Sequence, residues 1–161
     1  FKAPELYQLP YRNQADYADA LKSHQKALEI QKISLPPNHP DLANSYENIG
    51  EVYRHQGDYA NALKSHQKAL EIRKISFPPN HPDLANSYEN IGEVYRHQGD
   101  YANALNSHQK ALEIRKISLP PNHPDLAVCY SYIALVHSNQ REYANTLKSH
   151  QKALEIALNS V

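Results

Sequence analysis

Histidine is the residue type in this chain with the widest chemical repertoire, because imidazole both ligates metals and titrates near neutral pH. Four of the ten histidines recur every 42 residues, at His24, His66, His108 and His150. Equivalent positions in stacked helices lie roughly 10 Å apart, whereas the ligands of one metal ion lie about 2 Å from it. We therefore expect these histidines to be packed polar side chains, and we expect no metal site.

The other repeated histidines form two groups. His39, His81 and His123 each precede a proline, where we interpret them as helix-entry residues. His55 and His97 fall near the ends of predicted helices, where they are better placed than the other histidines for contact with a ligand or for sensitivity to pH.

The single cysteine, Cys129, has no histidine or other base in an evident arrangement. We expect it to be a small buried packing residue. The sequence contains no glycine-rich phosphate loop, no H-E-x-x-H and no G-x-S-x-G motif, and its four glycines leave little room for such loops. These observations predict a protein that is not an enzyme and has no cofactor.

Charge and composition exclude further classes of function. The 17 basic and 17 acidic side chains cancel, which disfavours nucleic acid or an anionic membrane as a partner. There is no long apolar run and no signal-like start. One cysteine cannot form an intrachain disulfide, so we expect a reducing, cytoplasmic location.

The histidines that recur along the chain belong to a repeat of 42 residues. Residues 17–58 and 59–100 differ at only three places, where Asp19, Gln31 and Leu35 become Asn61, Arg73 and Phe77. Residues 101–142 diverge from the block before them mainly between Val128 and Glu142. Repeats of this length are typical of stacked supersecondary units.

Each repeat predicts two helices. Apolar residues recur at three-and-four spacing, and Pro40 suits the first position of a helix, with Asn38 or His39 as its cap. Gly57 ends that helix and Asp58 caps the next. The predicted helices cover residues 16–34, 40–55, 82–97, 100–118, 124–139 and 142–158, with a further helix after Asp58.

Residues 1–16 match the repeat weakly. Pro10 falls where Val52 stands in the next repeat, and a proline inside a helix costs about 3 kcal/mol. We therefore expect a short, kinked or frayed segment. The predicted organisation is one domain over residues 1–161: a degenerate first helix at 1–15, the second helix of repeat 1 at 16–34, repeat 2 at 40–76, repeat 3 at 82–118 and repeat 4 at 124–158.

The fold class predicted by this pattern is all-α, since no segment alternates as a strand does. Each helix pair has an apolar face too wide for one partner helix, and stacking the next pair covers it. The repeats should therefore build an α-solenoid with a continuous core.

The repeat resembles the tetratricopeptide repeat, in the long form found in kinesin light chains and related scaffold proteins. The resemblance is carried by Tyr46, Ile49, Gly50, Tyr53, Tyr59, Ala62, Leu63 and Ala69. Its period of 42 exceeds the usual 34, and His66 stands where the family usually has a bulky aromatic. The resemblance implies a right-handed superhelix of antiparallel helix pairs, whose first helices form a concave groove that binds a peptide or a partner protein without catalysis.

The resemblance also implies which residues face the groove. Asn48 and Asn90 match the family's backbone-gripping asparagine most closely, since an amide both donates and accepts. The alternative is that these positions are solvated helix faces. The predicted groove residues are Asn44, Glu47, Asn48, Glu51, Arg54, His55, Asn86, Glu89, Asn90, Glu93, Arg96, His97, Val128, Tyr132 and Leu135.

The charges of these residues bear on the ligand. Glu47 and Glu89 stand where relatives that bind chaperone tails have lysines, and four glutamates against two arginines make the first two groove segments net acidic. We therefore expect no binding of an acidic chaperone tail and favour a basic or mixed-charge peptide.

Three apolar residues, Val128, Tyr132 and Leu135, share one stripe in the last repeat. They either anchor an apolar side chain of the ligand, or pack against a following helix or on helix 142–158.

The sequence thus favours a protein–protein interaction scaffold. A second hypothesis is a structural module that self-assembles end to end, because neither end shows the polar cap that terminal repeats need; its partner would be a second copy. A remote third is a non-catalytic fragment of a larger enzyme.

Overall fold

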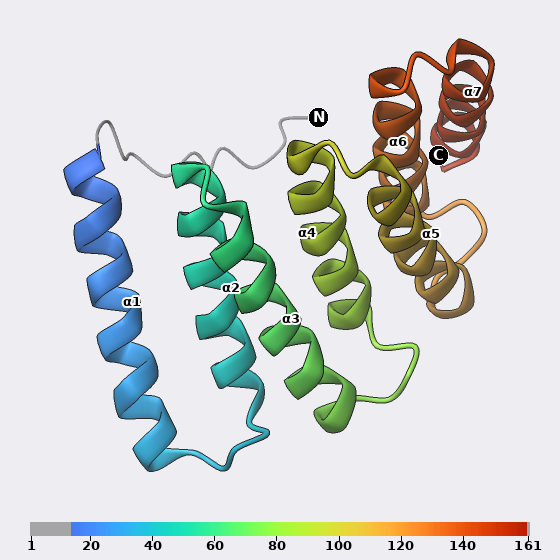
Figure 1. Ribbon diagram of the computed structural model, residues 1–161. Helices are drawn as coiled ribbons and strands as arrows, with labels where there is room; N and C mark the ends of the chain where they lie inside the picture. Colours follow the sequence, from blue (N-terminus) through green and yellow to red (C-terminus); the bar gives the residue numbers. More distant parts are fainter. Residues whose placement is uncertain (1–13, 161) are drawn as a thin grey trace.

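The computed structural model describes residues 14–160, and every regular element in that range is an α-helix (Figure 1). The all-α prediction is confirmed. Most of the segment expected to be kinked, residues 1–16, lies outside the described residues. The helices are α1 (Gln14–Ser34), α2 (Pro40–Gln56), α3 (Tyr59–Ser76), α4 (Pro82–Gln98), α5 (Tyr101–Ser118), α6 (Pro124–Asn139) and α7 (Tyr143–Asn159).

The helices stack in chain order, from α1 at one end to α7 at the other (Figure 1). The pairs α2 and α3, α4 and α5, and α6 and α7 are each antiparallel, and each pair packs on the next through its second helix. This arrangement is the predicted α-solenoid.

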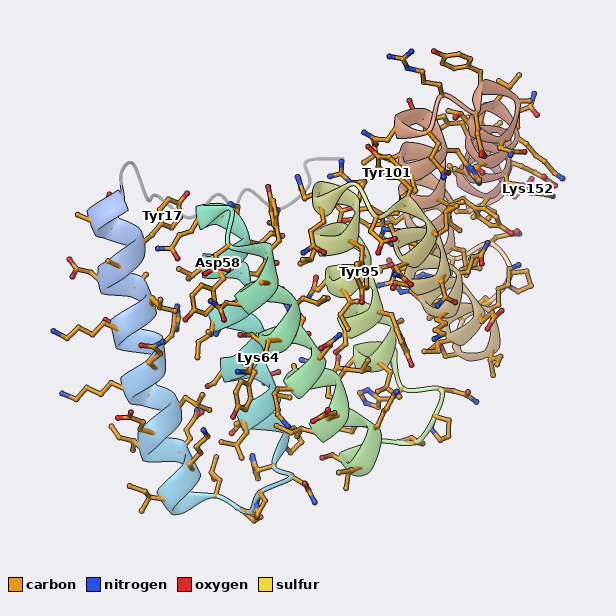
Figure 2. All side chains as sticks on the ribbon, in the orientation of Figure 1. Tyr17, Asp58, Lys64, Tyr95, Tyr101 and Lys152 are labelled. Atoms are coloured by element: carbon orange, nitrogen blue, oxygen red, sulfur yellow. The ribbon has the colours of Figure 1, made fainter. Side chains whose placement is uncertain are left out.

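Helix ends follow the predicted signals. The side chain of His39 caps α2 by accepting from the backbone N–H of Asp41, and Gly57 ends α2 with φ of 78°, in the left-handed region that glycine adopts without strain. Asp58, labelled in Figure 2 at the turn between α2 and α3, accepts from the backbone N–H of Asn61. The same turns recur around α4 and α5, so α4 is held to α5 as α2 is held to α3.

The core lies between consecutive helix pairs. One cluster joins Leu28 of α1 to Leu42 and Ile49 of α2 and Ile72 of α3. Two further clusters repeat this packing farther along the stack, around Leu84 and around Leu126. Fully buried alanines at Ala43, Ala62, Ala85 and Ala104 let the helices approach closely. Stacking therefore leaves the outer faces of the first helices available to line a groove.

Candidate functional site

A hollow of about 450 Å³ crosses three successive first helices. Every residue that lines it was among those predicted from the sequence. Five other predicted residues of α2 and α4 do not line it: Asn44, His55, Glu89, Arg96 and His97. The lining residues are Glu47, Asn48, Glu51 and Arg54 of α2, Asn86, Asn90 and Glu93 of α4, and Tyr132 of α6.

Arg73 of α3 binds Glu47, which lines the hollow, from the buried side of the helix stack. It is only 4% exposed, and its Nη1 and Nη2 both donate to the carboxylate of Glu47, with Nη2 lying 2.8 Å from Oε2. The same guanidinium donates to Asn44 Oδ1 at 2.8 Å and to Ser87 Oγ at 2.8 Å. One side chain of a second helix therefore ties the first helices on both sides of it together.

Arg115 of α5 repeats the arrangement one repeat later. It donates to both carboxylate oxygens of Glu89, at 2.5 and 3.1 Å, and to Asn86 Oδ1 at 2.8 Å. Cys129 takes the place of Ser87, with its Sγ 3.2 Å from Arg115 Nη1.

Cys129 is 1% exposed, which confirms the expected packing role. Burial, reinforced by the neighbouring carboxylate of Glu89, raises the pKa of its thiol to about 12. A thiol that stays protonated at neutral pH is a poor nucleophile.

The sequence-based description of the groove as net acidic is wrong. Arg73 and Arg115, which belong to second helices and were not predicted to be there, neutralise Glu47 and Glu89. Glu51 and Glu93 pair with Arg54 and Arg96 of their own helices, one turn farther along α2 and α4. The four glutamates of α2 and α4 are thus matched by four guanidinium groups.

A signal for the missed arginines was present in the repeats. In the last repeat, Ala157 takes the place of Arg73 and Arg115. The same repeat has Val128 and Ser131 at the positions of the asparagine and the glutamate that bind those arginines. The three members of the network change together, as contacting residues would.

The second ion pair of α2 and of α4 contains a glutamate that lines the hollow, Glu51 or Glu93. Arg96 donates to the two carboxylate oxygens of Glu93, each at 2.9 Å, and the Nε2 of His108 lies 3.6 Å from Oε1 of the same carboxylate. Burial acts to raise the pKa of Glu93, but the His108 ring beside the carboxylate and the two hydrogen bonds from Arg96 outweigh burial and hold that pKa at about 2. Glu93 is therefore ionised throughout the physiological range.

His66 and His108 are completely buried beneath these pairs. Neither ring has a hydrogen-bond partner within residues 14–160. The ring of Tyr132 stacks on that of His108, with centroids 5.1 Å apart and planes 1° from parallel. The packing role expected for these two histidines is confirmed, whereas His24 is half-buried and His150 is exposed.

Each buried histidine occupies the space that a side chain on the facing glycine would need. A Cβ built on Gly92 would lie 2.7 Å from Cε1 of His108. We expect Gly92→Ala to lower the free energy of unfolding by about 1–2 kcal/mol, because overpacking outweighs the gain of about 1 kcal/mol in helix propensity. Urea denaturation measures the change. In a His108→Ala background the same substitution should become stabilising, and a loss of equal size there would refute the steric account.

A second hollow, of about 350 Å³, lies at the α6–α7 end. It is lined by Ala127, Val128, Ser131, Tyr132, Leu135 and His150. The apolar stripe predicted from the sequence is therefore divided: Tyr132 borders both hollows, whereas Val128 and Leu135 border only the second.

Residues 14–160 contain no group of three or more histidine, cysteine or acidic side chains placed to hold a metal ion. In the same range, no helix has the length and apolarity needed to cross a membrane.

A solenoid of antiparallel helix pairs with a groove on its first helices defines the class of helical repeat scaffolds. The tetratricopeptide repeat matches this sequence over residues 11–75, 45–117 and 83–159, and the chain belongs to that family. Among curated proteins, a sequence search finds no match.

Solved structures with similar folds include BtubC (BKLC) from P. vanneervenii, with a TM-score of 0.81 and 20% identity over 91% of this chain and 59% of that one. The nearly identical TPR-like repeats of a Podosopora anserina protein assigned as a kinesin light chain have a TM-score of 0.77 and 16% identity, over 91% of this chain and 69% of that one. The apo form of RapI has a TM-score of 0.75 and 24% identity, over 89% of this chain and 50% of that one. This chain thus spans about half to two thirds of these proteins, and identities this low establish the fold alone.

Proposed function

We propose that this chain is an interaction scaffold whose groove, formed by α2, α4 and Tyr132 of α6, binds an extended peptide segment of a partner protein. The observation that carries the proposal is the continuous hollow of about 450 Å³ lined by three successive first helices. Tetratricopeptide repeats are in general protein-interaction modules, and a groove of this kind suits an extended segment that crosses several repeats.

The amides of the groove support binding through the peptide backbone. Asn48 is exposed, and its side chain has no hydrogen-bond partner among residues 14–160. Asn90 donates weakly to Glu47 Oε1, at 3.4 Å, which leaves its carbonyl oxygen available to accept. Together the two side chains offer the donors and acceptors that an extended backbone needs.

The ion pairs define what the groove selects against. Because every glutamate of the wall is paired with an arginine, net charge contributes little attraction for a ligand of either sign. An acidic tail finds Glu47 and Glu89 where a lysine clamp would stand, and the four arginines are already engaged. We therefore favour a peptide of mixed charge, bound mainly through its backbone.

The test uses peptides selected on the intact chain from a random 12-residue display library. We expect Asn48→Ala combined with Asn90→Ala to weaken the selected peptides by about 10- to 30-fold, because two hydrogen bonds are lost. Calorimetry measures the affinities. Asn106→Ala, on the exposed face of α5, is the matched control and should leave them unchanged. Equal affinities for the double variant and the control would exclude the groove as the binding site.

A further inference from the structure

Three hollows recur along the solenoid at the spacing of the repeat, one beside each of the first helices α2, α4 and α6. Their volumes are about 430, 380 and 430 Å³, within the range of ligand pockets. Each borders the loop that leads into its first helix, and these loops follow one edge of the stack in Figure 1. The hollows are called the tyrosine pockets below, after the residues that line one each: Tyr46, Tyr88 and Tyr130.

The tyrosine pockets are separate from the groove. Asn48 lines the groove, whereas Tyr46 lines a tyrosine pocket. The two residues are two positions apart and therefore lie about 200° apart around α2. No residue that lines the groove also lines a tyrosine pocket. A ligand in the groove therefore leaves these pockets open.

The floor of each tyrosine pocket is apolar. The middle pocket is lined by Leu84 and Tyr88 of α4 and by Ile114 of α5. Leu84 is buried, whereas Tyr88 is half-buried, so part of its ring is accessible to a ligand. The other two pockets have the same residue types at the equivalent positions, which are Leu42, Tyr46 and Ile72 in the first and Leu126, Tyr130 and Ile156 in the third.

Each tyrosine pocket carries one more positive charge than negative, because two lysines and one glutamate line it. In the middle pocket the ammonium groups of Lys74 and Lys110 lie 5.6 and 5.5 Å from the centroid of the Tyr88 ring, at cation–π distances. Neither lysine forms an ion pair within residues 14–160. The chain as a whole has 17 basic and 17 acidic side chains, so the excess belongs to the pockets and not to the composition.

The outer two pockets each keep one lysine without a carboxylate partner. Lys68 and Lys152 bind Glu71 and Glu155 at 2.7 Å. The other lysine, Lys32 or Lys116, lies over the tyrosine ring, at 5.4 and 5.5 Å, and forms no ion pair in the described part of the chain. Every tyrosine pocket therefore has an ammonium group at its side that can bind an anion.

Exposed isoleucines mark the same edge of the stack. Ile75 of α3, which lines the first pocket, and Ile117 at the equivalent position of α5 are each 67% exposed. Both helices are internal, with α2 and α4 packed on α3 and with α4 and α6 packed on α5. The exposure of these apolar side chains is therefore not a consequence of where the chain begins or ends, and such a surface is typical of an interaction site.

We propose that the tyrosine pockets form a second binding site, which takes an acidic segment of a partner protein whose apolar side chains fill successive pockets. Equivalent positions of neighbouring repeats lie roughly 10 Å apart, a span of three residues of an extended chain at about 3.3 Å each. Apolar residues at every third position, with carboxylates between them, match both the apolar floors and the unpaired lysines. A ligand that reaches a single pocket gains little, because the affinity comes from linking the three contacts.

The test uses a fluorescein-labelled peptide of 12 residues, made of four repeats of leucine followed by two aspartates. Fluorescence polarisation measures its binding to the intact chain up to about 200 µM. We expect binding that the triple variant Lys32→Ala, Lys74→Ala and Lys116→Ala weakens at least about 10-fold, because three charge contacts are lost. No binding to the unchanged protein would overturn the proposal.

The matched control is Lys22→Ala combined with Lys64→Ala and Lys148→Ala. These lysines, of which Lys64 is labelled on α3 in Figure 2, are exposed and line none of the tyrosine pockets. The control has the same net charge as the pocket variant and should bind the peptide as the unchanged protein does. Equal weakening in both variants would indicate a general effect of charge and would overturn the site.

Two other probes test the chemistry of the ligand. A peptide with alanine in place of each leucine should bind at least about 10-fold more weakly, because the apolar floors are then left unfilled. Equal affinity for the two peptides would show that only charge matters. A single strand of 12 thymidines that binds as tightly as the leucine peptide, and is released by the pocket variant, would indicate a polyanion site; either result would overturn the proposal.

The groove variant separates this site from the proposed function. Asn48→Ala combined with Asn90→Ala should leave the affinity for the leucine peptide unchanged, because neither residue lines a tyrosine pocket. If that variant abolished binding while the pocket variant preserved it, the peptide would occupy the groove. The second site would then be wrong and the proposed function would stand.

Discussion

Replacing Arg73 by alanine is expected to lower the free energy of unfolding by about 3 kcal/mol. The guanidinium is buried and contacts α2 through Glu47 and Asn44, and α4 through Ser87. Its removal leaves the Glu47 carboxylate, whose side chain is only 18% exposed, without the charge that compensates it. The loss is therefore dominated by an unpaired charge in a poorly solvated place, and not by missing packing alone.

The matched control is Arg54→Ala. Arg54 also pairs with a glutamate through two hydrogen bonds, but the two side chains are 22% and 31% exposed and belong to the same helix. Water replaces such a partner readily, so we expect a loss below about 1 kcal/mol. Removing Glu47 together with Arg73 should cost less than the sum of the two single changes, because no orphaned charge remains. Equal losses for Arg73→Ala and Arg54→Ala in urea denaturation would contradict the bracing role.

Acidification from pH 6.5 to pH 4 is expected to cost about 3 kcal/mol of stability through His66 alone. Burial is the main cause that lowers the pKa of His66 from 6.5 to about 4; Glu51 opposes it, and Arg54 and Arg73 add to it. In this window the unfolded chain binds a proton that the folded chain excludes. Stability is therefore complete above pH 6.5 and falls by about 1.4 kcal/mol for each pH unit below it.

His66→Phe is the control for this prediction, since an aromatic ring of similar shape does not titrate. Urea unfolding at several pH values between 7 and 4 should show a smaller slope in the variant. His55 and His97, whose pKa values are also lowered by burial, remain in both proteins. Their effect is reduced by exposure to solvent and accounts for part of the residual slope. The assignment to His66 fails if both proteins lose stability in parallel.

Local signals in the sequence predicted the helices and their limits closely. The Pro40 and Gly57 signals lie within one residue of the observed ends of α2, because proline at a helix start and glycine at its end act through their own backbone. The groove positions followed from the resemblance to the tetratricopeptide repeat. Once Asn48 and Asn90 are placed on equivalent first helices, the 42-residue period brings them onto one wall.

The charge of that wall was decided only by the tertiary structure. Arg73 lies 26 residues from Glu47 and on another helix, and no local pattern indicates that its side chain reaches through the stack to the groove. The burial of His66 against Gly50, and the separation of Val128 and Leu135 from the hollow on α2 and α4, arise in the same way. Helix ends depend on backbone groups a few residues apart, whereas ion pairing, burial and the limits of a groove depend on which side chains meet across packed helices.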